Sequence, residues 1–440
     1  MSTLKVNKLR DTAGSTDAIT LDPNGGAVLA GVTTISTARI TTGITTSVQV
    51  GGGVTISESG IEASGIGITC ANINGAKIGG RRNIIINGAM LVAQRSTSST
   101  DTGYQSVDRI QSEHTGADEA PTRQQIDLTS SDTGPYGEGF RKAYKLTNGN
   151  QTGGAGIQDI MNIRYQIEAR DIANCGWNYT SASSFVTLQF WIKSSVSQNF
   201  NMYLRARDGT EQTYAFDTGT LSADTWTKII KTIPGNSNIQ FDNDNGTGLQ
   251  LNFGPLWGTD RTDNSVNNDE WKTYASASRM KDNATTWYTT NDATLELTGL
   301  QLEVGAQATP FEHRSFGEEL ALCQRYFCKS YDIGTAPATA TFVGALHGRN
   351  YDSSGRSAHP TFVYFPSRMR AQPTMTFYAG DGQSNRYSTG STVGGTDLTG
   401  ENTFGTSFIN SESGIFHCDF GESVSAAHLY AFQYTADAEL

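Results

Sequence analysis

The chain has 440 residues, which is long enough for roughly two to four domains. Only 17% of the residues are charged while 48 are Gly, a balance typical of β-structure with many turns, because turns need the positive φ that Gly accepts. The formal net charge of −11 argues against nucleic acid and anionic membrane surfaces as partners, since both would repel the chain.

The N-terminal residues contain no apolar run that could serve as a signal peptide, and no segment approaches the length of a membrane span. We therefore expect synthesis in a cytoplasm without an export signal, and no membrane insertion. The five Cys are odd in number and scattered, so we expect no disulfide framework.

Residues 1–82 contain no aromatic side chain, because all 42 Phe, Trp and Tyr follow them, the first at Tyr104. Short phrases that pair Gly with β-branched residues recur instead, at 31–35, 43–46, 53–56 and 65–69. They predict a thin, repetitive β-shaft, whose strands must bury their apolar side against other repeats or other chains. An intertwined homotrimer would provide that burial; the alternative is a leader that orders only on docking. Either interpretation makes this segment, with its net charge of +2, the end that attaches.

Residues 83–316 have the pattern of a jelly-roll β-sandwich. Strands are indicated by alternating apolar residues at 186–193, 202–207 and 249–253. Apolar residues occupy odd positions up to Leu297 and even positions from Leu300 onward. That change of phase predicts a β-bulge or a strand break at Thr298 and Gly299.

A linking helix is predicted at 317–334. Ser315 and Glu318 form a capping-box pattern, apolar residues follow at helical spacing, and Gly334 lies just past the expected end. Residues 335–440 return to strand patterns and predict a small distal β-domain, or tip. In its last strand, Tyr430, Phe432 and Tyr434 should share one face. The expected fold class is therefore mainly β, with a shaft, a sandwich, one helix and a distal domain.

Several segments resemble known families. The run at 83–90 (NIIINGAM) looks like the opening strand of jelly-roll modules related to carbohydrate-binding modules, and 186–193, 226–228 and 299–305 resemble the same fold. The joining segment at 309–314 (TPFEHR) and 318–326 resembles bacteriophage tail-fibre and related virion proteins. The segments at 369–374 and 436–440 look like the distal domain of that group, and the leader is similar to structural proteins of marine and cyanobacterial phages.

The resemblance implies a location in the virion, as a tail fibre or another external appendage, and frequent trimerisation. We expect a phage tail-fibre protein that adsorbs to a host surface polysaccharide or lipopolysaccharide by multivalent, non-catalytic binding. The N-terminal segment would dock on a phage tail, neck or baseplate protein. One alternative is a purely structural virion component, such as a neck, baseplate or capsid-decorating fibre. The other is a polysaccharide depolymerase, although the chain has no recognisable catalytic motif.

Sugar binding needs aromatic platforms beside amides and carboxylates. Five rings in the long polar stretch after residue 254 fit that requirement: Trp257, Trp271, Tyr274, Trp287 and Tyr288. The alternative is that these rings pin the loop to the sandwich or face another subunit. In the distal domain, Tyr351, Tyr364, Tyr378 and Tyr387 are similar candidates with the same alternative.

No cofactor is expected. The run at 242–246 (DNDNG) resembles a calcium loop, but its Gly comes too early for an EF-hand and no bidentate Glu follows at the required distance. A structural Ca²⁺ and a solvated turn are the two interpretations of this run. No Cys/His group has the spacing of a zinc site.

Overall fold

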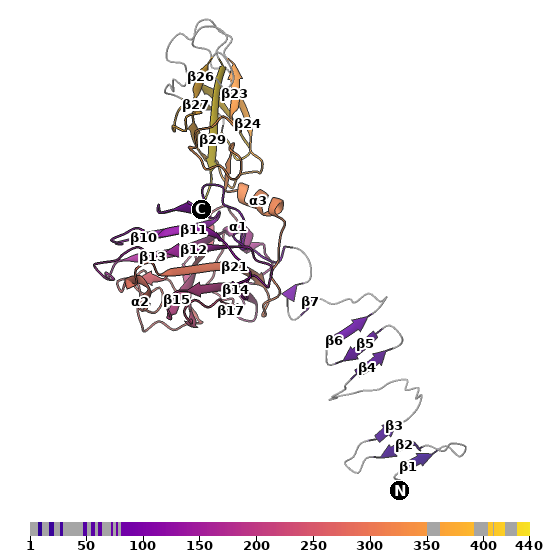
Figure 1. Cartoon of the computed structure of the whole chain (residues 1–440). Helices are drawn as coiled ribbons and strands as arrows, with labels where there is room; N and C mark the ends of the chain where they lie inside the picture. The colour runs from indigo at the N-terminus through magenta and orange to yellow at the C-terminus, as the bar shows by residue number, and fades with distance from the viewer. Residues whose placement is uncertain are drawn as a thin grey trace. The chain divides into compact units, whose positions relative to one another are not determined.

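The computed structural model describes residues 81–349, 361–390, 409–418 and 429–440, and elsewhere only the strands named below. Contacts divide the chain into two units, Met1–Cys70 and Ala71–Leu440, and each is described by itself. The predicted mainly β class is confirmed, because the described secondary structure consists largely of antiparallel sheets (Figure 1). None of the described helices is long and apolar enough to cross a membrane.

The first unit contains two antiparallel three-stranded sheets among its described strands. One sheet has β1 (Lys8–Arg10), β2 (Asp17–Leu21) and β3 (Ala27–Leu29); the other has β4 (Ser47–Val50), β5 (Val54–Ser57) and β6 (Gly60–Ala63). The hairpin of β7 (Asn72–Ile73) and β8 (Ala76–Lys77) opens the second unit. Of the four repeated phrases, the one at 53–56 overlaps β5, and the other three lie outside the described residues. The trimeric shaft stays a prediction.

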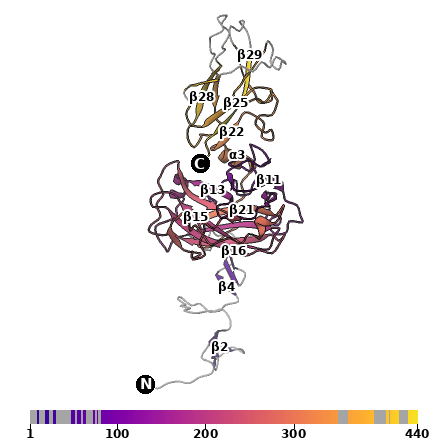
Figure 2. The same ribbon diagram turned by 90° about the vertical axis from the view of Figure 1, so that its left-hand side faces the viewer.

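Two antiparallel sheets form a sandwich (Figure 2). The seven-stranded sheet has the order β10-β13-β18-β15-β16-β20, with β19 beside β13. Its strands are β10 (Ile110–Thr115), β13 (Ile160–Glu168), β15 (Asn199–Ala206), β16 (Gln212–Thr220), β18 (Thr247–Asn252), β19 (Leu256–Trp257) and β20 (Trp271–Thr273). The six-stranded sheet has the order β17-β14-β21-β12-β11-β9. Its strands are β9 (Ser98–Ser99), β11 (Thr122–Asp127), β12 (Lys142–Thr147), β14 (Phe185–Ser194), β17 (Thr227–Pro234) and β21 (Thr294–Val304). The chain passes repeatedly between the sheets, as in jelly rolls.

The sandwich core lies between the sheets and follows from the alternation in the sequence. Leu188, Phe190 and Ile192 of β14 are completely buried. Phe190 meets Phe253, which follows β18 of the opposite sheet, with ring centroids 5.1 Å apart. The predicted strands at 186–193, 202–207 and 249–253 are confirmed as β14, β15 and β18.

The predicted β-bulge lies in β21. Its pairing with β14 shifts register, because Gln189 pairs with Gln301 but Trp191 pairs with Thr298. Gly299 adopts φ of +66°, and a Cβ at this position would lie 2.8 Å from Cζ of Phe140. Gly is therefore required here for both its backbone freedom and its lack of a side chain.

The segment at 83–90, expected from the resemblance to be the opening strand, is buried but is not a strand. The side chain of Asn83 takes the place of a neighbouring backbone. Its Oδ1 accepts from the Leu302 N–H at 3.1 Å, and its Nδ2 donates to the Leu300 carbonyl at 3.1 Å. An amide side chain can satisfy one donor and one acceptor of β21 in this way, as a strand would.

The linking helix is shorter than predicted. α3 (Phe316–Gln324) begins at the predicted capping box of Ser315 and Glu318, which is confirmed, but it ends at Gln324 instead of near 334. Residues of the expected second half form β22 (Phe327–Lys329), because Phe327 and Cys328 are buried by pairing with the last strand. The other described helices, α1 (Ala169–Ala173) and α2 (Thr286–Thr289), are short.

The distal β-domain is built around β29 (Leu429–Asp437), which pairs with four strands. These are β22, β23 (Leu346–Arg349), β25 (Thr374–Tyr378) and β26 (Ser388–Gly390). A second sheet contains β24 (Thr361–Tyr364), β28 (Ser413–Cys418) and β27 (Phe404–Ser407). Tyr430, Phe432 and Tyr434 of β29 are all buried in the domain core, which confirms their predicted common face.

Candidate functional site

Two of the predicted sugar-binding rings lie inside the sandwich. Trp287 and Tyr288 of α2 are 0% and 1% exposed. The Trp287 Nε1–H donates to the Thr294 carbonyl at 2.9 Å, and the Tyr288 hydroxyl donates to Asp159 at 3.0 Å. Their faces are covered, so the structure favours the alternative interpretation, in which they anchor the loop.

Two further predicted rings both contact Arg279 on the outer face of the seven-stranded sheet. Trp257 is buried and packs on Tyr203, with ring centroids 5.7 Å apart. The guanidinium of Arg279 lies 4.6 Å from the Trp257 ring and donates to the Tyr274 hydroxyl at 2.9 Å. Arg205 lies 3.5 Å from the half-buried ring of Tyr274. Cation–π contacts of this kind fix the loop on the sheet and occupy the ring faces.

Trp271, the fifth ring, is separate from these. It lies in edge strand β20, donates to the Pro234 carbonyl at 2.7 Å and contacts Tyr214. It is half-buried. The structure therefore does not gather the five predicted rings into one site.

The calcium-like run at 242–246 caps the N-terminal end of α1. The carbonyls of Asp244 and Gly246 accept backbone N–H groups of Arg170 and Ala169, and Asn245 donates to the Arg370 carbonyl. In the described part of the chain, no group of three His, Cys, Asp or Glu side chains could hold a metal ion. The structure thus gives this run a capping role.

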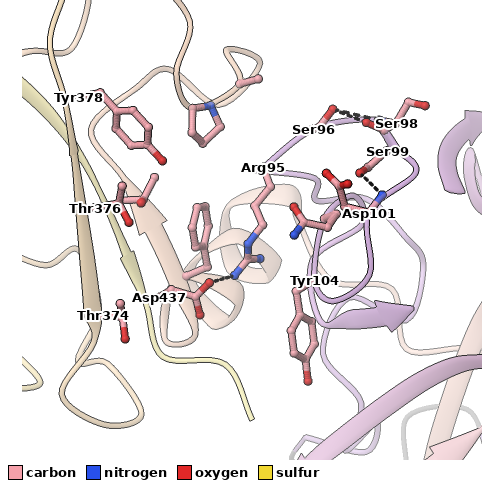
Figure 3. Close-up of a pocket in the computed structure, with 15 residues that line it drawn as sticks. Arg95, Ser96, Ser98, Ser99, Asp101, Tyr104, Thr374, Thr376, Tyr378 and Asp437 are labelled. Atoms are coloured by element: carbon pink, nitrogen blue, oxygen red, sulfur yellow. Dashed lines mark hydrogen bonds and ion pairs between the residues drawn. The ribbon is translucent and has the colours of Figure 1, made fainter. Parts of the chain in front are cut away.

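A polar pocket of about 650 Å³ lies where the sandwich meets the distal domain (Figure 3). We call it the junction pocket. Its lining residues are Arg95, Ser96, Ser98, Ser99, Asp101, Tyr104, Gln105, Phe327, Ala336, Pro337, Thr374, Thr376, Tyr378, Thr435 and Asp437. A volume of this size accommodates a small ligand or a few sugar units.

One wall of the junction pocket is the sheet of β25 and β29. Thr374, Thr376 and Tyr378 stand on the same face of β25, because side chains alternate along a strand. On β29, Asp437 lies opposite Thr374 and Thr435 lies opposite Thr376. The pairing register thus lines up hydroxyls and a carboxylate on a rigid surface.

The opposite wall comes from the sandwich, at residues 96–105. Ser96 donates to the Ser98 carbonyl at 2.8 Å, and Ser99 accepts from the Asp101 N–H at 3.0 Å, which holds this turn-rich segment in shape (Figure 3). The carboxylate of Asp101 is exposed and has no hydrogen-bond or ion-pair partner among the described residues. It is free to accept hydrogen bonds from a ligand.

The floor of the junction pocket is Arg95, whose guanidinium lies 3.7 Å from the Phe327 ring. It donates to Asp437 at 2.9 Å and to Glu439 at 3.4 Å. Burial works to lower the pKa of Arg95, but Glu439 and Asp437 raise that pKa above its usual value, so the side chain stays charged. Its charge is neutralised within the protein.

The sequence does not predict the junction pocket as a binding site. Of the four distal rings that the sequence suggests, Tyr378 lines the pocket. Tyr387 is 1% exposed, Tyr364 is 77% exposed, and Tyr351 lies outside the described residues. Ser and Thr are common throughout the chain, so the sequence does not indicate which of them line a pocket. Only the folded arrangement of two distant segments brings them together.

No family profile matches the chain, and no curated protein matches it. Similar solved structures include the enzymatically active domain of tailspike protein 4 of bacteriophage CBA120, at 10% identity and a TM-score of 0.27 over 50% of this chain and 21% of that one. They include a putative sugar-binding protein of Bacteroides thetaiotaomicron, at 9% identity and a TM-score of 0.27 over 51% and 100%. The N-terminal cellulose-binding domain of a Cellulomonas fimi β-1,4-glucanase has 12% identity and a TM-score of 0.24 over 49% and 100%. The match spans about a fifth of the tailspike chain. Identities and TM-scores this low indicate no function for this chain.

Proposed function

We propose that this chain is a bacteriophage virion appendage of the tail-fibre type, which holds a host surface glycan in the junction pocket without catalysis. The observation that carries the proposal is the lining of the junction pocket. Hydroxyls, an amide and carboxylates surround an open space, with Tyr378 pointing into it (Figure 3). Sugar recognition uses groups of these kinds, an aromatic ring for the apolar face of a sugar and polar groups for its hydroxyls.

The placement in a virion rests on the sequence. The segments at 309–314 and 318–326 resemble phage fibre proteins, and the ring-free residues 1–82 fit an attachment segment that is completed by other copies. A single sugar site of millimolar affinity contributes only about −4 kcal/mol, so several copies must engage together for firm adsorption. A trimer would supply them.

The test is binding of the purified full chain to polysaccharides extracted from bacterial surfaces, measured on a glycan array. The change Tyr378→Ala should lower binding at least about tenfold, because it removes the ring that points into the pocket. Thr100→Ala is the matched control, since Thr100 is exposed on the neighbouring segment but does not line the pocket. Equal binding by both variants would contradict the proposed site.

Two further readouts test the rest of the proposal. Native mass spectrometry should show a species of about 142 kDa, three times the 47.3 kDa chain. Incubation with a bound polysaccharide should release no reducing ends. Release of reducing ends would make the chain a depolymerase, and a monomer at micromolar concentration would remove the multivalent mechanism.

A further inference from the structure

We infer that the junction pocket takes an uncharged glycan and discriminates against acidic sugars. This inference rests on the proposed function, because it specifies the ligand of the same site. It follows from the charged side chains that face the pocket and from which of them already have an ion-pair partner inside the protein.

Among the fifteen lining residues, Arg95 is the one cation, and Asp101 and Asp437 are the anions. Arg95 is 9% exposed and is already bound to Asp437 and Glu439. Recognition of a sugar carboxylate or sulfate relies on a cation that can form new charge-assisted bonds. The pocket has no such cation to offer.

Two neighbouring cations, Arg109 and Lys329, are engaged elsewhere. Arg109 is 1% exposed and pairs with Glu439, and it also donates to the Gln166 carbonyl. Lys329 does not line the pocket, and its Nζ donates to the carbonyls of Gln94, Ile333 and Thr335. Neither side chain reaches the ligand space without breaking its present contacts.

The anions are the accessible charges. Asp101 is exposed and its carboxylate is unpaired among the described residues, and the Asp437 side chain is 43% exposed. A bound sugar carboxylate would be repelled chiefly by Asp101, because the charge of Asp437 is paired with that of Arg95. A sugar hydroxyl would instead donate to either carboxylate, and a carboxylate accepts hydrogen bonds from two hydroxyls at once.

The walls add groups that suit neutral sugars. The hydroxyls of Thr374, Thr376 and Thr435 can each donate or accept, and the ring of Tyr378 stands at the end of their row. Tyr378 is held in place by Tyr331, whose ring centroid lies 5.9 Å away. The pocket therefore combines a ring, hydroxyls and two acceptors, which matches a hexose that bears several hydroxyls.

The experiment uses the full chain and matched pairs of glycans. In each pair one member is neutral and the other carries a carboxylate on its sugar units: mannan and polymannuronate, galactan and polygalacturonate, glucan and polyglucuronate. Affinities are measured by isothermal titration calorimetry. We expect the neutral member of the bound pair to bind at least about tenfold more tightly than the acidic member. Neutral binding should change less than about twofold between low and high salt, since no ligand charge is screened.

The variant Asp101→Asn separates charge from shape. It should tighten binding of the acidic member several-fold relative to the neutral member, because the amide removes the repulsion of a ligand carboxylate while its oxygen still accepts a hydrogen bond; the readout is the ratio of the two affinities. Thr100→Ala should leave both affinities unchanged. Tighter binding of the acidic member by the unaltered chain, or no effect of Asp101→Asn on the ratio of the two affinities, would overturn the inference while the proposed glycan site stands. If neither member of any pair binds, and array binding is equally absent, the proposed function itself fails.

Discussion

At the scale of single residues, the sandwich depends on side chains that replace backbone pairing. Asn83 bonds to both Leu300 and Leu302 of β21. Glu312 accepts the N–H groups of Arg82 and Asn83, and buried Glu319 accepts the N–H of Asn87. Glu312 and Glu319 thus hold residues 82–87 in place through their backbone N–H groups.

Replacing Asn83 tests the side-chain bonds to β21. We expect Asn83→Ala to lower the free energy of unfolding by about 2–3 kcal/mol, because it leaves buried backbone groups of β21 without partners. Urea unfolding followed by fluorescence measures the change. The control Asn238→Ala is at an exposed position and should stay within about 0.5 kcal/mol. Similar losses in both variants would show that the side-chain bonds of Asn83 contribute little to stability.

His114 makes stability depend on pH. Arg123 donates to its Nδ1 at 3.1 Å, so the ring must be neutral, and burial followed by the charge of Arg123 lowers the pKa of His114. As the pH falls below about 6.5, His114 becomes protonated in the unfolded chain but stays neutral in the folded chain. The free energy of unfolding therefore decreases as the pH falls. The variant His114→Gln should lose less unfolding free energy between about pH 7.5 and 5 than the unaltered chain. Equal losses would exclude His114 as a source of acid sensitivity.

At the scale of elements, the sequence predicts features that depend on local periodicity. The strands β14, β15 and β18, the bulge in β21 and the capping box of α3 follow from alternation, phase and side-chain chemistry. The end of α3 does not follow from these local patterns, because it depends on the distant strand β29. Phe327 and Cys328 gain more burial by pairing with β29 than a longer helix would give. The junction pocket depends on contacts between distant segments, which periodicity cannot reveal.

The bulge can be tested with two glycines of equal backbone geometry. Gly299 and Gly219 have φ of +66° and +67°, but a Cβ at 219 would meet nothing within 4 Å. We expect Gly219→Ala to cost about 1 kcal/mol from the backbone alone. Gly299→Ala should cost at least about 2 kcal/mol, because its Cβ also overlaps Phe140. Thermal unfolding of both variants measures the difference, and equal costs would mean that Phe140 moves aside freely.

At the scale of the whole second unit, the sandwich and the distal domain are joined by buried ion pairs. Glu168 of β13 is 0% exposed in its side chain and accepts from Arg325 at 2.7 Å and from the Tyr326 hydroxyl at 3.1 Å. Arg109 pairs with Glu439, and its guanidinium lies 3.5 Å from the Tyr326 ring. Buried pairs of this kind fix orientation more than they add stability.

Breaking one of these pairs should loosen the joint. Glu168→Ala leaves Arg325 without its carboxylate and should lower the free energy of unfolding by about 3 kcal/mol. Limited proteolysis should then cut near residues 325–330 sooner than in the unaltered chain. The control Glu412→Ala removes an exposed pair with Arg368 and should change stability by less than about 1 kcal/mol. A Glu168→Ala chain that resists proteolysis like the control would show that other contacts hold the joint.

The two walls of the junction pocket are encoded far apart, one at 96–105 and the other beyond residue 326. A recombination event in the gene, with its crossover in the stretch for α3, would exchange one wall and retain the other. About half of the lining residues would then be inherited from each parent. The lining of the pocket would in this way change in a single genetic step, without any point mutation in the sandwich.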